Sequence, residues 1–223
     1  MTVTLAFDVY GTLIDPLGIA RDLESVAGSE AGRFAVIWRE KQLEYLFRRG
    51  LGRDYQPFSL CTSQALDYTC DFLGVRPSRV ARQALMERYR DLPAYPGTSE
   101  ALEALVGCGR RCYAFSNGEP GELEVLLEGA GLAGHLEGIV SVHEVQSFKP
   151  DPAVYRHFLA SAGSCANDTW LVSGNPFDVI GASKVGWNTA WLRRDPKAVF
   201  DPWGVEPTVK IGSLNDLLAG VTD

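Results

Sequence analysis

Residues 3–13 read Val-Thr-Leu-Ala-Phe-Asp-Val-Tyr-Gly-Thr-Leu, so that an aspartate, Asp8, directly follows a short and mostly apolar run. A run of this kind is typical of a strand that is buried on both faces, as in a parallel sheet. In the turn that follows, Gly11 permits unusual backbone dihedrals and the Thr12 hydroxyl can donate a hydrogen bond to a carboxylate. Asp8 is therefore a candidate nucleophile. A carboxylate that only caps the turn fits the same residues equally well.

Further apolar runs along the chain are also short enough to be buried strands. They lie at residues 112–115, 138–142, 170–172 and 188–192, with one more near 208–211. Helical spacing of apolar residues separates them, at residues 99–106, 120–129, 152–162 and 178–185. This alternation predicts an α/β fold with a doubly wound parallel sheet.

Residues 15–93 interrupt the alternation, because they show helical periodicity and no convincing strand. The clearest helical patterns lie at residues 33–49, 62–73 and 78–90, and a Tyr-Pro-Gly turn at 95–97 marks the return to the sheet. We therefore expect a Rossmann-like catalytic core of residues 1–14 and 94–223. The helical cap subdomain of residues 15–93 is inserted into it and closes over the ligand-binding edge of the sheet.

The composition excludes several classes of protein. A chain of 223 residues with 46% hydrophobic and 22% charged residues is typical of one globular domain, with or without an insertion. The net charge of −7 argues against a nucleic-acid partner. No apolar run is long enough to span a membrane and the N-terminus lacks the features of a signal peptide, so we expect a cytoplasmic protein without a membrane partner. The five scattered cysteines and three histidines lack zinc-binding spacing.

Polar residues follow the ends of the second and fourth predicted strands. They are Ser116, Asn117, Ser173, Asn175 and Asp178. Because the carboxyl ends of parallel strands share one edge of a sheet, we expect these side chains to converge on Asp8.

Four segments resemble, in the same order, the motifs of the haloacid dehalogenase superfamily. They are residues 7–13, Phe115-Ser116-Asn117-Gly118, Ser147-Phe148-Lys149-Pro150 and the six residues from Ser173 to Asp178. The resemblance implies that fold, with Asp8 as the nucleophile. Most members are phosphatases with a second aspartate at the position of Tyr10 and a Gly-Asp pair where this chain has Gly174-Asn175. A phenol and an amide are poor replacements for carboxylate ligands of Mg²⁺, so we expect no metal and no organic cofactor.

The pattern Asp-x-Tyr-Gly-Thr is instead similar to the L-2-haloacid dehalogenase family, and residues 38–44 are similar to that family's first cap helix. At about 100° per residue, Arg39 shares a helix face with Leu43 and Leu46. A guanidinium on an apolar face needs a carboxylate or a bound anion. A structurally paired arginine is one interpretation. By resemblance, Arg39 instead receives the departing halide.

The resemblance assigns the remaining roles. Tyr10, Asn117, Phe58 and Phe177 would line the substrate and halide pocket, although Asn117 and Phe58 also fit ordinary turn and core positions. The Ser116 hydroxyl and the amides after it would hold the substrate carboxylate.

The hydrolytic water would be held by Asn175 and Asp178, with Ser173 and Lys149 organising them. Lys149 precedes a proline, which favours a loop near Asp8, where an ammonium stabilises an ionised carboxylate. Tyr155 would hold Lys149 or Asp8 through its hydroxyl.

We therefore expect an (S)-2-haloacid dehalogenase, a hydrolase that acts on carbon–halide bonds. Asp8 would displace halide from C2 of a short 2-haloacid with inversion, and water would cleave the aspartyl ester to give an (R)-2-hydroxyacid. A superfamily phosphatase with an atypical metal site and a protein that binds small carboxylates without turnover are the alternatives. The expected partners are the haloacid and halide. A homodimer is compatible with the sequence, which determines neither the oligomeric state nor the preferred halide and acid chain length.

Overall fold

The computed structural model describes residues 3–220, and its centre is a sheet of six parallel strands. The strands lie in the order β3-β2-β1-β4-β5-β6. Their bounds are Thr4–Asp8 for β1, Arg111–Ser116 for β2, Gly138–Ser141 for β3, Thr169–Ser173 for β4, Asn188–Leu192 for β5 and Val209–Ile211 for β6. The predicted α/β fold with a parallel sheet is confirmed, and each predicted strand lies within one residue of its observed bounds.

The register of the three central strands brings their carboxyl ends to one level. Asp8 at the end of β1 pairs with Phe115 of β2, and Phe7 pairs with Val172 of β4. Ser116 and Ser173, the last residues of β2 and β4, therefore lie beside the end of β1. Strand order reverses at β1, where crevices of doubly wound sheets bind ligands.

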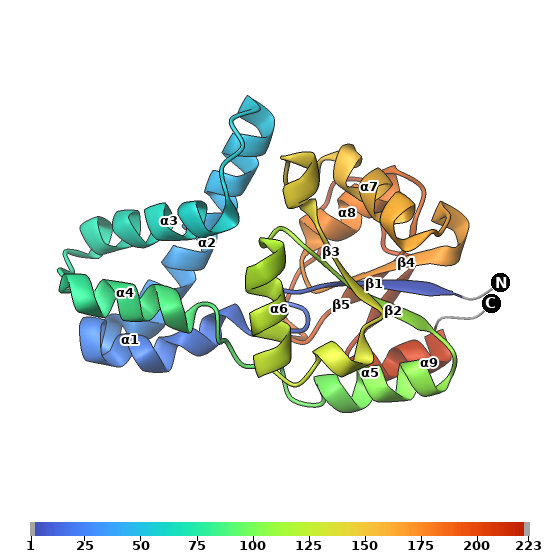
Figure 1. Ribbon diagram of the computed structural model, residues 1–223, viewed down its shortest axis with the longest axis horizontal. Coiled ribbons are helices and arrows are strands. Elements are labelled where there is room, and N and C mark those ends of the chain that lie inside the picture. The colour runs from blue at the N-terminus through green and yellow to red at the C-terminus, as the bar shows by residue number, and fades with distance from the viewer. Residues whose placement is uncertain (1–2, 221–223) are drawn as a thin grey trace.

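Helices cover both faces of the sheet (Figure 1). Helices α5, α6 and α9 cover one face and α7 and α8 cover the other. They comprise Thr98–Gly107 for α5, Pro120–Gly129 for α6, Pro152–Ala162 for α7, Pro176–Lys184 for α8 and Leu217–Gly220 for α9. Helix α8 begins two residues before its predicted start, because Pro176 occupies the first turn, where no backbone N–H is needed.

Four further helices lie beyond the carboxyl ends of the strands (Figure 1). They are α1 at Ala20–Ala27, α2 at Ala31–Gly52, α3 at Phe58–Leu73 and α4 at Arg79–Arg88. Helix α1 was not predicted, and α3 begins four residues before its predicted start, immediately after Pro57. We propose that residues 15–93 form a cap subdomain, and we call these four elements the cap helices.

The two connections between the core and the cap helices run side by side. The Asp15 amide donates to the Pro93 carbonyl at 2.9 Å, and the Tyr95 amide donates to the Leu13 carbonyl at 2.9 Å. Entry to and exit from the helical segment therefore occur at one place, close to the turn that follows Asp8.

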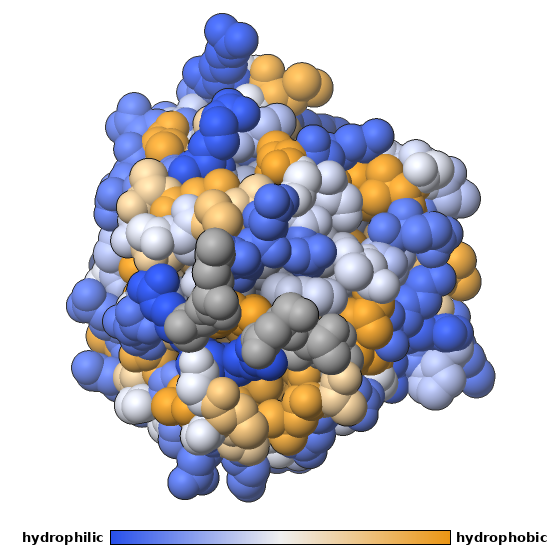
Figure 2. All heavy atoms as spheres, turned by 90° about the vertical axis from the view of Figure 1, so that its right-hand side faces the viewer, coloured by the Kyte–Doolittle hydropathy of each residue, from blue (hydrophilic) through white to orange (hydrophobic). Residues whose placement is uncertain are grey.

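The face of the molecule that lies away from the cap helices carries hydrophilic residues with several separate apolar areas between them (Figure 2). Within residues 3–220, no helix combines the length and the apolar character that a membrane span requires.

Candidate active site

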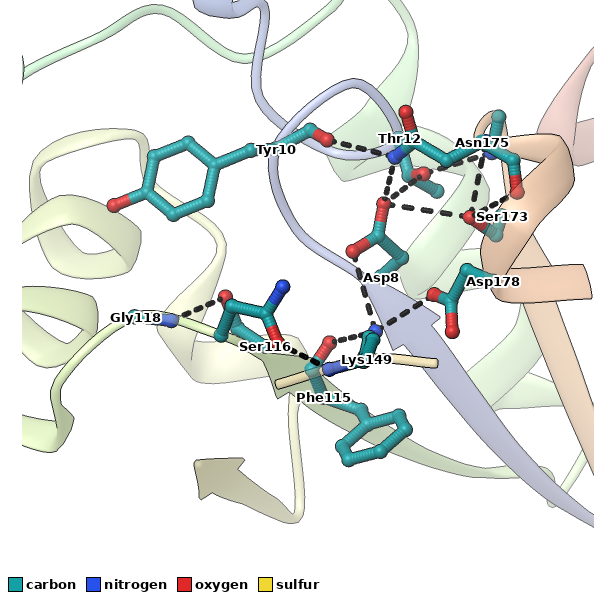
Figure 3. A network of polar contacts seen from close by, with 12 residues as sticks. Asp8, Tyr10, Thr12, Phe115, Ser116, Gly118, Lys149, Ser173, Asn175 and Asp178 are labelled. Carbon is teal, nitrogen blue, oxygen red and sulfur yellow. Dashed lines mark hydrogen bonds and ion pairs between the residues drawn. The ribbon is translucent and has the colours of Figure 1, made fainter. Parts of the chain in front are cut away.

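Asp8 is 7% exposed, and its two carboxylate oxygens have different surroundings (Figure 3). Oδ2 accepts hydrogen bonds from Thr12 Oγ1 at 2.8 Å, from Asn175 Nδ2 at 2.7 Å and from Ser173 Oγ at 3.4 Å. Oδ1 accepts a hydrogen bond from Lys149 Nζ at 3.2 Å. Oδ2 is thus held by three neutral donors, whereas Oδ1 is the less occupied oxygen and the better placed to attack.

The loop after β1 and the loop after β4 pack closely against each other, and this contact fixes the groups that donate to Oδ2. The Gly174 amide donates to Thr12 Oγ1 at 2.9 Å, which leaves the Thr12 hydroxyl proton for Asp8. A Cβ atom on Gly174 would lie 2.4 Å from the carbonyl oxygen of Gly11, and Gly11 has a φ of +92°. Both glycines are therefore required for this close approach.

Lys149 is 1% exposed, so it is not a solvated surface lysine. Its ammonium group donates to Asp8 Oδ1, to Asp178 Oδ2 at 2.7 Å and to the Phe115 carbonyl at 2.8 Å. These three bonds match the three donors of an ammonium group. The Lys149 amide also donates to Asn117 Oδ1 at 2.9 Å, which fixes the loop.

Asp178, at the first turn of α8, is fully buried. Its Oδ1 accepts a hydrogen bond from the Tyr155 hydroxyl at 2.8 Å. Burial raises the pKa of Asp178 to about 6, with Lys149 lowering it and the nearby charge of Asp8 raising it. A Cβ atom on Gly181 would lie 2.3 Å from the Tyr155 hydroxyl oxygen, so this glycine provides the space in which Tyr155 reaches Asp178.

Arg39 on α2 is half-buried and contacts neutral acceptors. Its guanidinium donates to Gln42 Oε1 at 2.7 Å and to the Tyr10 carbonyl at 3.2 Å. Gln42 is fixed in turn, because its Oε1 also accepts from the Tyr89 hydroxyl and its Nε2 donates to Thr62 Oγ1. Within the described residues, Arg39 has no carboxylate partner. Arg39 is thus held by neutral hydrogen-bond acceptors and by no charged partner in this part of the chain.

A pocket lies between Asp8 and Arg39. It is lined by Asp8, Tyr10, Arg39, Leu43, Leu46, Phe58, Ser116, Asn117, Asn175 and Phe177. Eight of these ten are predicted site residues, and Leu43 and Leu46 were missed as pocket residues. Thr12, Ser173 and Lys149 lie behind the pocket against Asp8, and Tyr155 lies behind Asp178.

Two donors on the pocket wall are not used by the protein. Asn117 accepts through Oδ1, so its Nδ2 faces no hydrogen-bond partner among the described residues. Ser116 Oγ accepts from the Gly118 amide at 3.1 Å, and its own proton has no acceptor within that part of the chain. With Arg39, these groups can bind an anionic molecule opposite Asp8.

Sequence reasoning missed two residues that position the site. Gln42 lies three residues after Arg39, and a buried polar side chain at this helical spacing is a signal that could have been found. Glu119 accepts from the amide of Ser59 at 2.9 Å and from the Ser59 hydroxyl at 3.3 Å, at the start of α3. Sixty positions separate this pair, so no local pattern predicts it.

The residues present do not fit a Mg²⁺ ion. The Lys149 ammonium group already pairs with one oxygen of Asp8 and one oxygen of Asp178, so it balances their charge without a metal. Among residues 3–220, no group of three or more His, Cys, Asp and Glu side chains could hold a metal. The Tyr10 side chain, which follows Asp8 by two residues, is directed away from it in Figure 3.

Known proteins resemble this chain over nearly its whole length. A family model described as haloacid dehalogenase-like hydrolase matches residues 2–186. Haloacetate dehalogenase H-2 of Moraxella sp. (strain B) is 33% identical over 96% of this chain and 95% of its own. An (S)-2-haloacid dehalogenase of Pseudomonas fluorescens is 32% identical over 95% of this chain and 92% of its own.

A solved structure shows the same arrangement of the chain. The L-2-haloacid dehalogenase of Xanthobacter autotrophicus, with chloropropionic acid covalently bound, superposes with a TM-score of 0.91, at 28% identity and with 100% of both chains covered. This chain therefore belongs to the haloacid dehalogenase-like hydrolases and, within them, to the L-2-haloacid dehalogenase family.

Proposed function

We propose that this protein is an (S)-2-haloacid dehalogenase that hydrolyses short 2-haloacids through an ester on Asp8. The observation that carries the proposal is a pocket with an aspartate oxygen at one end and, at the other, an arginine that has no carboxylate partner among residues 3–220. Relatives named (S)-2-haloacid dehalogenase and the covalent complex of the Xanthobacter enzyme support it.

In the first step, the substrate carboxylate accepts hydrogen bonds from the Ser116 hydroxyl and the backbone amides that follow. Oδ1 of Asp8 then forms a bond to C2 while the carbon–halogen bond breaks, and halide leaves with the bonding electrons. Arg39 and the free Nδ2 of Asn117 receive the halide beside Phe177. Attack opposite the leaving group inverts C2, and the fixed carboxylate selects the enantiomer.

In the second step, water attacks the Asp8 carbonyl carbon and negative charge develops on Oδ2. Thr12, Ser173 and Asn175 already donate to this oxygen, so they stabilise the charge without reorganisation. Asp178, paired with Lys149, takes the proton of the water. The bond between the carbonyl carbon and Oδ1 breaks, and the (R)-2-hydroxyacid leaves with Oδ1 and a proton. The net reaction consumes one water and releases halide and one proton.

The superfamily phosphatase and the binding protein are not favoured. A phosphatase of this superfamily would need carboxylate ligands where this chain has Tyr10 and Asn175, and we propose that neither step uses a metal. A binding protein would not need three donors on one oxygen of Asp8. The five unpaired cysteines support a reducing compartment, and we propose the cytoplasm. Size-exclusion chromatography with light scattering would show whether the protein is a homodimer.

Halide release from each enantiomer of 2-chloropropionate tests the proposal. We expect release from the (S) enantiomer, no effect of EDTA, and a loss of roughly 10⁴-fold or more in Asp8→Asn. Release that requires added Mg²⁺, or equal release by the parent and Asp8→Asn, would contradict it. Binding of 2-chloropropionate without any halide release would instead support the binding protein.

A further inference from the structure

A second cavity of about 250 Å³ adjoins the pocket of Asp8 and lies between the cap helices α3 and α4 and the core helix α6. Tyr10 and Phe58 line both spaces, and their rings stack with centroids 4.9 Å apart and planes at 23°. The ring pair therefore forms the partition between the two spaces. The second cavity is large enough for several methylene groups, since a water molecule occupies about 30 Å³ in the liquid.

The wall of the second cavity is mostly apolar, with charged groups at its edge. Met86 and Tyr89 add apolar surface to that of the ring pair. Glu87 and Glu122 also line it, and Arg90 Nε lies 3.4 Å from Glu122 Oε1. Two carboxylates against one guanidinium disfavour an anionic guest. The wall thus favours a neutral chain over one that ends in a second carboxylate.

The Tyr10 hydroxyl belongs to this partition, and it is not one of the fully buried polar atoms that lack a partner. Tyr10 is 5% exposed, and its hydroxyl makes no hydrogen bond with any described residue. Figure 3 shows the ring extending away from Asp8. Burial raises the pKa of Tyr10, with further contributions from Tyr89 and Glu122, both of which line the second cavity. The hydroxyl oxygen therefore keeps access to solvent, and a polar ligand atom at this place can accept its hydrogen bond instead of water.

We propose that the second cavity binds the side chain of 2-haloacids longer than three carbons, an inference that rests on the proposed dehalogenase function. The carboxylate, C2 and the halogen occupy the pocket of Asp8, and the chain reaches the second cavity past the edges of the stacked rings of Tyr10 and Phe58, the two residues that line both spaces. Neutral chains of about four to six carbons suit the mostly apolar cavity. The Tyr10 hydroxyl can donate a hydrogen bond to a polar atom on such a chain.

The test compares two tryptophan substitutions on α4. Met86 lines the cavity, whereas Val80 on the same helix is 75% exposed. The measurement is kcat/KM for (S)-2-chloropropionate and for (S)-2-chlorohexanoate. We expect Met86→Trp to lower the ratio of hexanoate to propionate activity by roughly 10-fold or more, with propionate activity retained. Val80→Trp should leave the ratio unchanged.

Other outcomes overturn the inference. If Met86→Trp is folded, as checked by circular dichroism, and kcat/KM falls equally for both acids, the cavity is only an entrance. If kcat/KM is unchanged for both acids, the cavity has no part in binding. If Met86→Trp does not fold, Met86→Ala replaces it. We expect the smaller side chain to raise the ratio, and no change would count against the inference. A parent that releases chloride from neither acid overturns the proposed function as well. A parent that is active on propionate and inactive on hexanoate overturns the chain subsite alone.

Discussion

The two ends of the pocket differ in whether their charged groups have charged partners. At the core end, the ammonium of Lys149 lies between the carboxylates of Asp8 and Asp178, and every group has a charged partner. At the cap end, the guanidinium of Arg39 contacts the amide oxygen of Gln42 and the carbonyl of Tyr10. The core end is thus satisfied before substrate arrives, whereas the cap end carries a positive charge that only an incoming anion can balance.

This difference separates structural charge from functional charge. Breaking a buried ion pair costs about 3–5 kcal/mol, because it leaves an uncompensated charge away from water. Removing a charge that has no charged partner carries no such cost. The two cations of the site should therefore respond differently when each is replaced by a neutral side chain of similar length.

Lys149→Met should have the largest effect. Two buried carboxylates would then face each other without a cation, so we expect kcat to fall by roughly 10³-fold or more and the melting temperature to fall by about 5–15 °C. Halide-release kinetics and calorimetry measure the two effects. A variant that keeps the melting temperature of the parent would show that Lys149 does not balance the core end.

Arg39→Met should lower kcat/KM by roughly 10²-fold while the melting temperature stays within about 2 °C. Bromide binding, followed by titration calorimetry, should weaken in parallel, because Arg39 is the cation that lines the pocket. Lys41→Met on the same helix is the control, since Lys41 pairs with Glu44 and does not line the pocket. If Arg39→Met is much less stable and binds bromide as well as the parent, Arg39 is a structural charge like Lys149.

The pH dependence of the rate tests the role of Asp178 at the core end. Burial raises the pKa of Asp178 to about 6, and the proposed hydrolysis needs the ionised form, so the rate of ester hydrolysis should fall as the pH drops below about 6. The Tyr155 hydrogen bond stabilises the ionised carboxylate and so lowers this pKa. Tyr155→Phe should therefore move the acid limb to higher pH. A shift to lower pH, or none, would show that Asp178 does not set this limb.

Glu119→Gln should have the smallest effect. Its carboxylate accepts two hydrogen bonds from Ser59 at the first turn of α3, where a negative charge is worth about 0.3–1 kcal/mol. Because α3 begins with Phe58, we expect KM to rise by roughly 2–5-fold while kcat changes little. Glu124→Gln on the exposed side of α6 is the control. If the two substitutions change KM equally, Glu119 has no positioning role.

The sequence predicts the core end of the site better than the cap end. Asp8, Ser116 and Ser173 end their strands, and strand order alone places them together. Lys149 and Asp178 follow from the motifs that carry them. The local pattern of residues 3–13 and the alternation of strands and helices are sufficient for this part, because the parallel sheet fixes the distances between elements.

The cap end depends on contacts between segments far apart in the chain. Periodicity places Arg39 on the inner face of α2, yet the neutral character of its partners follows from where Gln42 and Tyr10 lie. The Glu119–Ser59 contact and the second cavity result from how the cap helices pack on the core. No periodicity or motif encodes that packing, so these features are visible only in the structure.

In the proposed mechanism, Asp8 attacks the substrate through Oδ1 and is regenerated by water at its carbonyl carbon. Multiple turnovers of (S)-2-chloropropionate in water labelled with the heavy oxygen isotope, followed by mass spectrometry of the peptide that contains Asp8, test this directly. We expect the heavy isotope to accumulate in the Asp8 carboxylate, and the hydroxyacid from the first turnover to carry unlabelled enzyme oxygen. An Asp8 that stays unlabelled while the hydroxyacid takes the label from the start would contradict it.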